Sequence, residues 1–186
     1  MIEFCAGDLL VSPPNIPDPR FNKSVILLTA HQNSEGSFGL CLNKPTDYTI
    51  NNIIEPLSLR LEHDIPVFWG GPMSNHTVWM IHEPGWAVNN TMTINEHWSL
   101  TSHESMFHHL ADGDYPERYR FIIGHASWAP NQLEGEVNGE EPWSHKHSWL
   151  IVKQPDPDWL VNIEIDKLWT GATGLCSQQT VLHWME

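Results

Sequence analysis

Two short apolar runs on either side of a proline-rich segment constrain this chain more than any other feature. Residues 7–31 read GDLLVSPPNIPDPRFNKSVILLTAH, in which four prolines separate Leu9–Val11 from Val25–Leu28. Proline has a fixed φ and no backbone N–H, so the segment between the runs can be neither a helix interior nor a central strand. The pattern therefore predicts two strands joined by a tight, stiff crossover.

The polar residues of this crossover allow two interpretations. In a catalytic loop, Ser12 would be the nucleophile, His31 the base and Asp18 the group that orients the base. In an architectural loop, the Ser12 hydroxyl and the Asp18 carboxylate would bind nearby backbone amides. Nothing like a GxSxG motif surrounds Ser12, so the architectural interpretation is favoured.

Short segments rich in β-branched and aromatic residues, bounded by Gly, Pro or Asn, predict eight strands. They are Gly7–Val11, Ser24–Ala30, Phe38–Asn43, Pro66–Trp69, Thr77–His82, Thr91–Ile94, Arg120–Gly124 and Ser148–Val152. HQNSEGSFG, between the second and third of these, is typical of a hairpin loop in which Gly36 takes a positive φ.

Helix signals are fewer. The segment from Thr101 to Gly113 has an N-cap residue, a Glu three positions later and a C-terminal glycine, which predicts a helix. The other expected helices are 49–57 with Thr49 as cap, 129–137 with Pro130 in its first turn, and a C-terminal helix capped by Ser177. Because strands outnumber helices without regular alternation, we expect an α+β fold with a mixed sheet.

Length and composition restrict the class of protein. The 186 residues suffice for a single domain, residues 1–186, with a sizeable core. The longest apolar stretches fall far short of the roughly 20 residues that span a bilayer, and the N-terminus lacks a signal-peptide pattern. These features predict a cytoplasmic protein without membrane contact.

Charge and cysteine spacing exclude further classes. Nine basic and 23 acidic residues give a formal net charge of −14, which repels phosphate backbones and disfavours direct nucleic-acid binding. The three cysteines, Cys5, Cys41 and Cys176, are far apart and form no CxxC pair. Their spacing favours reduced, mostly buried thiols over a disulfide framework or a zinc site.

Metal and cofactor signals are weak. His145 and His147 in WSHKHSW have the best metal-like spacing, with Glu140 and Glu141 upstream, but a third ligand is missing. FWGGPM matches neither common phosphate-binding glycine motif, so it predicts a turn that needs glycine conformations. We therefore predict no metal and no cofactor.

Four ordered segments carry a family resemblance: GDLLVSPPNIPDPRFNKSVILLTAH, GSFGLCLNKP, VFWGGPM, and GHASWAPNQLEGEV followed by Trp143. They resemble the AlgH/YqgE family of bacterial proteins. The resemblance implies a single α+β domain with a complex, partly barrel-like sheet around a few helices. It implies no reaction, because the family has no assigned biochemical function, and its transcriptional-regulator label reflects a genetic association with alginate production in one lineage.

The residues that match the family pattern occur in all four segments. They are Ser12, Asp18, Phe21, Ser24, His31, Gly39, Asn43, Pro45, Gly70, Gly71, Pro72, Gly124, Trp128, Gln132, Leu133 and Glu134. The chain departs from the pattern at Lys44, where the family has Arg, and at His125 and Ser127, where it favours Tyr and Gly. Lysine does not reproduce a bidentate guanidinium contact, so no anion clamp is predicted at Lys44.

Polar residues of distant segments predict a groove where the Ser12–Arg20 crossover, the Asn43 turn and the Gln132–Glu134 helix start converge. The expected ligand-binding residues are Ser12, Asp18, Asn43, Gln132 and Glu134. Since no complete catalytic set is evident, we expect a non-enzymatic, regulatory domain that binds a small ligand or a protein partner. A hydrolase that uses Ser12 or a water activated by His31, and a DNA-associated transcriptional regulator, are the alternatives.

Overall fold

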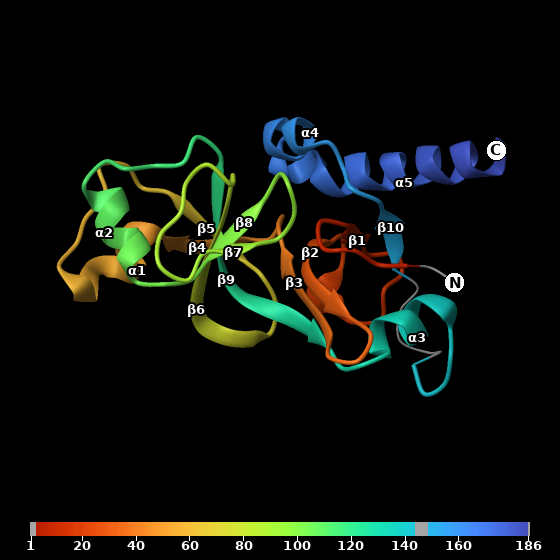
Figure 1. Ribbon diagram of the computed structural model, residues 1–186. Coiled ribbons are helices and arrows are strands. Elements are labelled where there is room, and N and C mark those ends of the chain that lie inside the picture. The colour runs from red at the N-terminus through yellow and green to blue at the C-terminus, as the bar shows by residue number, and fades with distance from the viewer. Residues whose placement is uncertain (1–2, 144–148, 186) are drawn as a thin grey trace.

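One curled, mixed β-sheet forms the frame of the protein (Figure 1). The computed structural model describes residues 3–143 and 149–185. Across these residues the strand order is β10 (Leu150–Val152), β1 (Leu9–Val11), β2 (Val25–Gln32), β3 (Gly36–Cys41), β9 (Tyr119–Trp128), β6 (Met73–His82), β8 (Ser99–Thr101) and β7 (Met92–Thr93). β4 (Pro45–Thr49) pairs with β5 (Pro66–Trp69), which joins the sheet through a parallel pairing with β9. The predicted α+β class with a mixed, partly barrel-like sheet is confirmed.

Helices lie around the sheet rather than alternating with its strands (Figure 1). The described residues include α1 (Ile50–Ile54), α2 (Ser105–Ala111), α3 (Gln132–Asn138), α4 (Pro157–Asn162) and α5 (Leu168–Met185), with 3₁₀ turns η1 (Pro19–Phe21), η2 (Glu55–Leu57) and η3 (Ile165–Lys167). In the figure, α1 and α2 lie at one end of the sheet, whereas α3 and the α4–α5 pair lie on two sides of the half that contains β1, β2 and β10.

All eight predicted strands are present. Pro66–Trp69 has the predicted ends, the ends of the other seven differ, and Gly36 has the expected positive φ of 97°. The sequence does not predict β4 or β8. β4 is mostly exposed and reads PTDYT, which lacks the apolar alternation of a half-buried strand. β8 has only three residues, too few to produce a period.

Three predicted helix starts are wrong and one is confirmed. Thr101 is the last residue of β8, so α2 begins only at Ser105. Pro130 precedes α3 instead of lying in its first turn, and Ser177 lies inside α5. Thr49 is the N-cap of α1, as expected.

Strands β1 and β2 are buried on both faces. Leu9 and Leu27 belong to a first hydrophobic cluster that α4 and α5 cover, whereas Leu10 and Leu28 belong to a second cluster that the proline-rich crossover and α3 cover. Successive side chains of a strand point to opposite faces. A strand covered on both faces must be apolar at every position, which explains the two uninterrupted apolar runs of the sequence.

Side chains fasten the proline-rich crossover to the ends of these strands. The buried Ser12 hydroxyl accepts a hydrogen bond from the Ser24 N–H at 2.8 Å, and the Ser12 N–H donates to the Ser24 carbonyl at 2.9 Å. Asp18 is the N-cap of η1 and accepts the Arg20 N–H at 3.0 Å. The backbone contacts predicted for Ser12 and Asp18 are therefore present.

Asn43 fastens the same region from the end of β3. Its side-chain oxygen accepts the Val25 N–H at 2.9 Å, and its amide nitrogen donates to the Lys23 carbonyl at 2.8 Å. Lys23 has a positive φ of 52°, so its own backbone cannot continue the ladder. Asn43 thus supplies hydrogen bonds that the strand pairing leaves unmade.

The FWGGPM segment connects β5 to β6, and Gly71 has a positive φ of 153°, the kind of glycine conformation that the sequence predicts. Its backbone also makes a close crossing at Gly70. The Gly70 N–H donates to the Ile123 carbonyl at 2.8 Å, and the Gly70 carbonyl accepts the Cys41 N–H at 2.9 Å. A Cβ atom on Gly70 would lie 2.3 Å from the carbonyl oxygen of Gly124, which itself has a positive φ of 75°. No residue with a side chain fits at position 70 without a shift of backbone.

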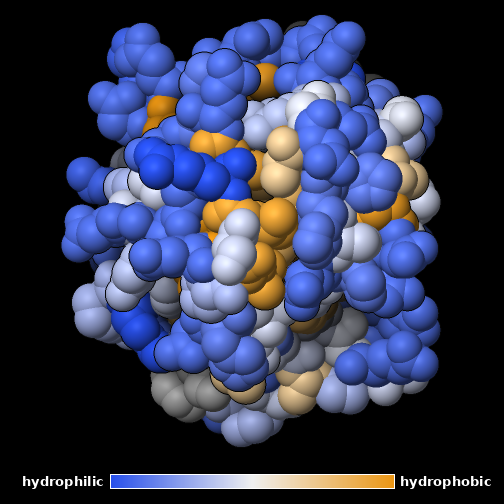
Figure 2. Space-filling model, turned by 90° about the vertical axis from the view of Figure 1, so that its left-hand side faces the viewer, coloured by the Kyte–Doolittle hydropathy of each residue, from blue (hydrophilic) through white to orange (hydrophobic). Residues whose placement is uncertain are grey.

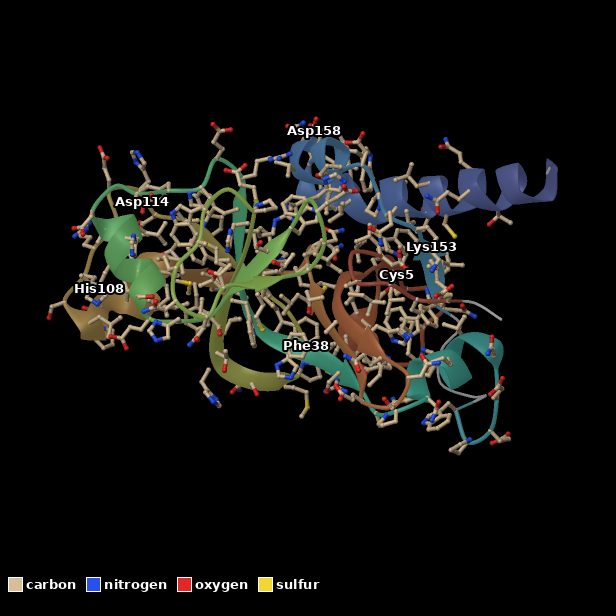
Figure 3. All side chains as sticks on the ribbon, in the orientation of Figure 1. Cys5, Phe38, His108, Asp114, Lys153 and Asp158 are labelled. Carbon is tan, nitrogen blue, oxygen red and sulfur yellow. The ribbon has the colours of Figure 1, made fainter. Side chains whose placement is uncertain are left out.

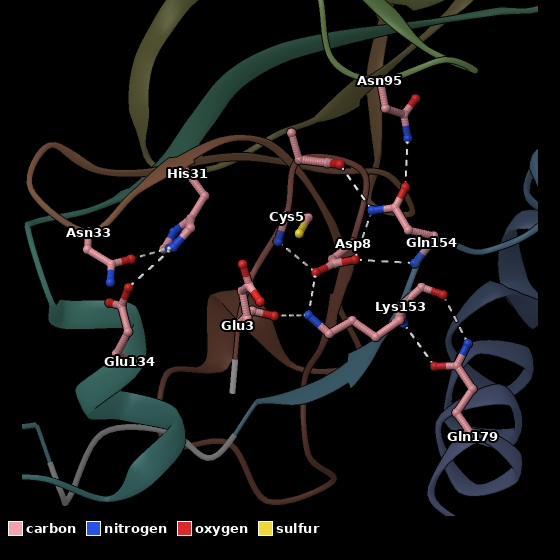
Figure 4. A network of polar contacts seen from close by, with 11 residues as sticks. Glu3, Cys5, Asp8, His31, Asn33, Asn95, Glu134, Lys153, Gln154 and Gln179 are labelled. Carbon is pink, nitrogen blue, oxygen red and sulfur yellow. Dashed lines mark hydrogen bonds and ion pairs between the residues drawn. The ribbon is translucent and has the colours of Figure 1, made fainter. Parts of the chain in front are cut away.

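A buried carboxylate ties the two ends of the chain together (Figure 4). Asp8 is fully buried and accepts the Cys5 N–H at 2.9 Å and the Lys153 ammonium at 2.8 Å. Gln154 adds a backbone and a side-chain N–H to the same carboxylate. The first residues of the chain are thereby fixed to β10, and Cys5 and Lys153 lie close together in Figure 3.

The cysteines follow the prediction in part. All three are free thiols, and Cys41 is buried. Cys5 is exposed and Cys176 is half-buried, so the expectation of mostly buried thiols is wrong for Cys5. Burial raises the pKa of the Cys41 thiol, which keeps it protonated and unreactive.

A third hydrophobic cluster packs α1 and α2 against the other end of the sheet, away from the first two. It includes Ile50, Ile54, Phe107 and Phe121. Figure 2, which views this end, shows a strip of hydrophobic side chains between hydrophilic ones. None of the helices in the described part of the chain has the length and apolar character that a membrane span requires.

Replacing Ser12 by alanine should lower the free energy of unfolding by about 1–3 kcal/mol, because the buried Ser24 N–H would lose its acceptor. Urea unfolding followed by fluorescence measures this change. Ser34→Ala, at an exposed position of the hairpin loop, is the matched control and should change stability by less than about 0.5 kcal/mol. Equal stability of the two variants would contradict the architectural role of Ser12.

A chain of hydrogen bonds fixes the protonation state of buried His82. Its Nδ1 lies 2.8 Å from the Glu83 carbonyl, which can only accept, so Nδ1 carries the proton. Nε2 then accepts from the Thr101 hydroxyl at 2.9 Å, and Thr101 in turn accepts from Thr91 at 2.8 Å. The Thr91 oxygen also accepts the Val88 N–H at 3.0 Å, which fixes the direction of the chain. With a neutral His82 imidazole, every donor and acceptor in this chain of hydrogen bonds has a partner.

Stability should therefore fall as the pH falls below about 6.5, the ordinary pKa of histidine. Burial lowers the pKa of His82 in the folded state, so the unfolded state takes up the proton first and is favoured between that lowered value and 6.5. Urea midpoints measured from pH 8 to about pH 5 test this expectation. His82→Gln should show a shallower decline than the wild type, and parallel curves would contradict it.

Candidate functional site

A hollow of about 530 Å³ opens over the second hydrophobic cluster. Four segments form its walls: the crossover, the turn before β6, the last residues of β9 and the first turns of α3, with Trp149 closing one side. Its lining includes Asp18, Arg20, Phe21, Ser127, Trp128, Gln132, Glu136 and Trp149. Segments far apart in the sequence therefore meet at one concave surface, as ligand sites commonly do.

Glu136 is the most unusual residue of this hollow. Its side chain belongs to a residue that is only 3% exposed. One carboxylate oxygen accepts the indole N–H groups of Trp128, at 3.0 Å, and Trp149, at 2.9 Å. The other accepts the Gln132 amide at 2.8 Å. All three donors are neutral, so they fix the carboxylate in place without balancing its charge.

The start of α3 orients Gln132 toward this carboxylate. Asn131 has a left-handed conformation with φ of 61°, which turns the chain sharply into the helix. The Gln132 side-chain oxygen accepts the Ala129 N–H at 3.0 Å, which leaves the amide nitrogen to reach Glu136. Gln132 and Glu136 are four residues apart on one face of the helix.

Aromatic rings form the apolar wall. Phe21 contacts Trp149 edge-on at 5.8 Å between ring centroids and lies 5.6 Å from Trp69. Trp128 and Trp149 also meet edge-on, at 6.0 Å. Phe21, Trp128 and Trp149 all line the hollow, so aromatic carbon forms one wall of it.

Asp18 and Arg20 form an ion pair at the mouth of the hollow, with 2.7 Å between Arg20 Nη2 and Asp18 Oδ2. Asp18, as hydrogen-bond acceptor and negative charge, raises the pKa of the exposed Arg20 guanidinium. Within this pair the two charges compensate one another.

The structure brings together some of the predicted site residues and separates others. Asp18 and Gln132 line the hollow, as the expected groove requires. Ser12 and Asn43 do not line it, because they bind the backbone of the crossover from behind. Glu134 points away from the hollow, with one carboxylate oxygen 3.4 Å from His31 Nε2 (Figure 4).

The structure does not bring Ser12 and His31 together, as the alternative with His31 as the base for Ser12 would require. Ser12 follows β1 and bonds Ser24 at the start of β2, whereas His31 lies near the far end of β2. Seven residues of extended chain separate these positions by roughly 20 Å. His31 Nδ1 contacts the Ser37 hydroxyl at 2.8 Å, and the ring packs edge-on against Phe4. His31 is therefore occupied at the β2–β3 hairpin and cannot act on Ser12.

The metal candidates His145 and His147 lie outside the described residues. Elsewhere in the chain, residues 3–143 and 149–185 contain no cluster of three or more histidine, cysteine or acidic side chains that could hold a metal ion. The predicted absence of a metal therefore stays a prediction.

Glu136 is the site residue that sequence reasoning misses. A signal exists, because Glu136 follows Gln132 by four positions and Leu133 and Val137 mark the buried face of the same helix. The tryptophans that hold it come from β9 and from the segment before β10, and their approach to Glu136 depends on the tertiary fold. From the sequence alone, a glutamate beside an apolar helix face is expected to be exposed to solvent.

Comparisons with known proteins agree with this architecture. A family model described as AlgH-like matches residues 9–180. UPF0301 proteins of Burkholderia mallei strain SAVP1 and Burkholderia pseudomallei strain K96243 are each 32% identical to the chain over 175 residues, covering 91% of it and 86% of the relative.

Two solved structures are similar in fold. The solution structure of the AlgH protein from Pseudomonas aeruginosa has a TM-score of 0.75 and 23% identity, covering 94% of this chain and 92% of its own. The crystal structure of protein DIP2367 from Corynebacterium diphtheriae has a TM-score of 0.67 and 21% identity, covering 92% and 86%.

Glu136→Gln should destabilise the protein by about 1–3 kcal/mol, because its amide would place an N–H group against donors that now face a carboxylate oxygen. The near-ultraviolet circular dichroism of the tryptophans should change with it. Glu35→Gln, an exposed substitution in the hairpin loop with the same change of charge, is the control and should leave both measurements unchanged. Wild-type stability of Glu136→Gln would show that the three contacts are not maintained in solution.

Proposed function

The chain belongs to the AlgH-like family, and from the hollow beside Glu136 we infer that it is a non-enzymatic binding domain. Its ligand would have an apolar, flat body and a positively charged or hydrogen-bond-donating head. Small molecules of this kind fit the description, and so does a lysine or arginine side chain of a protein partner.

The single observation that carries this proposal is the charge of Glu136, which no cationic side chain in residues 3–143 or 149–185 contacts. The carboxylate is buried, it borders the hollow, and its three partners are neutral. A buried charge without an opposite charge is costly, and a cation in the hollow would reduce that cost. The net charge of −14 favours the approach of cations further.

The aromatic wall supports the same class of ligand. Trp128, Trp149 and Phe21 supply ring surface beside the carboxylate. A cation over an aromatic face gains attraction in addition to its contact with the carboxylate. The polar groups at the edge, including the Ser127 hydroxyl, are few, as expected of a site in which shape and one charge determine specificity.

The hydrolase alternative that uses Ser12 has less support than a binding role. The Ser12 hydroxyl is buried and bonded to Ser24, and His31 lies at the other end of β2. A DNA-associated role has no comparable support, because a charge of −14 opposes contact with phosphates. For the location of the protein we propose the cytoplasm, a choice that the free thiols of Cys5, Cys41 and Cys176 support.

Benzylamine, benzyl alcohol and benzoate test the proposal, because they share a ring and differ in the charge of the head. Amide chemical-shift changes in a titration should show benzylamine binding most tightly and benzoate least. Ser127→Phe, an exposed substitution at the rim, should block the hollow while leaving the Glu136 contacts intact, and should weaken benzylamine binding about tenfold or more.

Glu35→Gln serves as the matched control and should bind like the wild type. Equal binding of the three compounds, or unchanged binding by Ser127→Phe, would overturn the proposal. Glu136→Gln adds a direct test of the charge, since it should reduce the preference for benzylamine over benzyl alcohol.

A further inference from the structure

Two arginines near the start of β9 have different surroundings. Arg118 lies just before the strand, and Arg120 is its second residue. Arg118 Nε lies 3.4 Å from Glu83, and its Nη1 lies 2.9 Å from Asp158 on α4 (Figure 3). The charge of Arg118 is therefore balanced twice.

Arg120 lacks such a partner. Its Nη1 donates to the Leu42 carbonyl at 3.2 Å, and the guanidinium lies 5.4 Å from the centre of the Phe68 ring. No carboxylate in residues 3–143 or 149–185 forms an ion pair with it. A guanidinium has five N–H donors, so the bond to Leu42 leaves most of its capacity unused.

A second, smaller hollow adjoins the Arg120 guanidinium. Its volume is about 90 Å³, and apolar side chains dominate its walls, among them Leu27, Leu42, Ile81, Trp98 and Leu160. All five are buried residues of the first hydrophobic cluster. A positive charge thus stands at one side of a space that is otherwise apolar.

The surroundings make an anion favourable there. Burial lowers the pKa of Arg120 to about 10, which shows the cost of its desolvation and still leaves it charged at neutral pH. A carboxylate would restore an opposite charge and can accept two parallel N–H bonds from the guanidinium. An inorganic phosphate would offer charge but no apolar part for the leucine and tryptophan walls.

We propose that this hollow binds a short-chain aliphatic carboxylate, whose head pairs with Arg120 and whose alkyl chain lies among Leu27, Leu42 and Leu160. The small volume excludes long fatty acids and ring systems. The net charge of −14 disfavours the approach of an anion at long range. Binding therefore depends on the short-range pairing of the carboxylate with Arg120.

This site is independent of the hollow beside Glu136. It lies in the first hydrophobic cluster, whereas Phe21, Trp128 and Trp149 of the larger hollow belong to the second, on the other face of β1 and β2. The two hollows also take ligands of opposite charge. Failure of one proposal therefore leaves the other intact.

Titration with sodium butyrate, followed by amide and arginine side-chain resonances of the full chain, tests the proposal. In a series from acetate to butyrate, affinity should rise about fourfold with each added methylene, and it should fall for decanoate, which is too long for the hollow. Butylamine, with the charge reversed, should not bind there. Resonances of Arg120 and Leu160 should shift, and those of Glu136 should not.

Substitutions separate the charge from the shape. Arg120→Gln should weaken butyrate binding about tenfold or more, whereas Arg60→Gln, which removes the same charge at an exposed position, should not change it. Because Arg120→Gln can also disturb the bond to Leu42, Val161→Phe at the apolar wall provides a second variant and should weaken butyrate more than acetate.

Three results would overturn the proposal: no shift of the Arg120 resonance with butyrate, equal affinities of acetate and butyrate, or equal losses in Arg120→Gln and Arg60→Gln. The last two would identify adventitious anion binding to surface charge. Benzylamine binding by the same sample would meanwhile report on the Glu136 hollow, so the two outcomes are read separately.

Discussion

The hydrogen bond between the Ser12 hydroxyl and the Ser24 N–H is the contact on which the rest of the structure depends. It closes a corner whose prolines have no N–H groups to offer, and Asn43 completes the corner from the next strand. The closed corner lies over the second face of β1 and β2 and gives those strands a cover on both sides. It also places Phe21 and Asp18 at the wall of the larger hollow. The polar residues of the crossover thus hydrogen-bond its backbone and, by fixing its shape, also form part of the larger hollow.

Local chemistry explains how much of this could be predicted. Strong apolar patterns and glycine or proline boundaries predicted all eight strands, and the glycines of FWGGPM predicted the positive φ found at Gly71. The early start of α5 could not be predicted, because Gly171 lowers the helix propensity of this segment. The glycine is needed there for close packing against Trp159 and Ile163. Within the site, Asp18 and Gln132 could be predicted, because the turn that holds Asp18 and the helix start that holds Gln132 are local features of the sequence. Glu136 does not follow, because its partners Trp128 and Trp149 come from segments that only the folded sheet brings near it.

The two hollows show how one sheet can separate opposite charges. Glu136 lies in the second cluster among indole donors, and Arg120 lies in the first among aliphatic side chains. β9 supplies a wall of both, because Arg120 lies near its start and Ser127 and Trp128 lie at its end. Each charge is held by neutral groups and faces accessible space. Charges of this kind are costly to the fold, and ligands of opposite sign are the natural compensation.

The pairing of β1 with β10 has a consequence for biosynthesis. Leu9 is aligned with Val152, so a strand made among the first residues must wait for one made near the end. On the ribosome, β1 and β2 can meet early, but the edge of β1 stays open until β10 and α5 have emerged. The ion pair of Asp8 with Lys153 forms at the same late stage and holds β10 beside β1. A nascent chain that stalls short of β10 therefore exposes an apolar strand edge, the kind of surface that chaperones bind and that aggregation exploits.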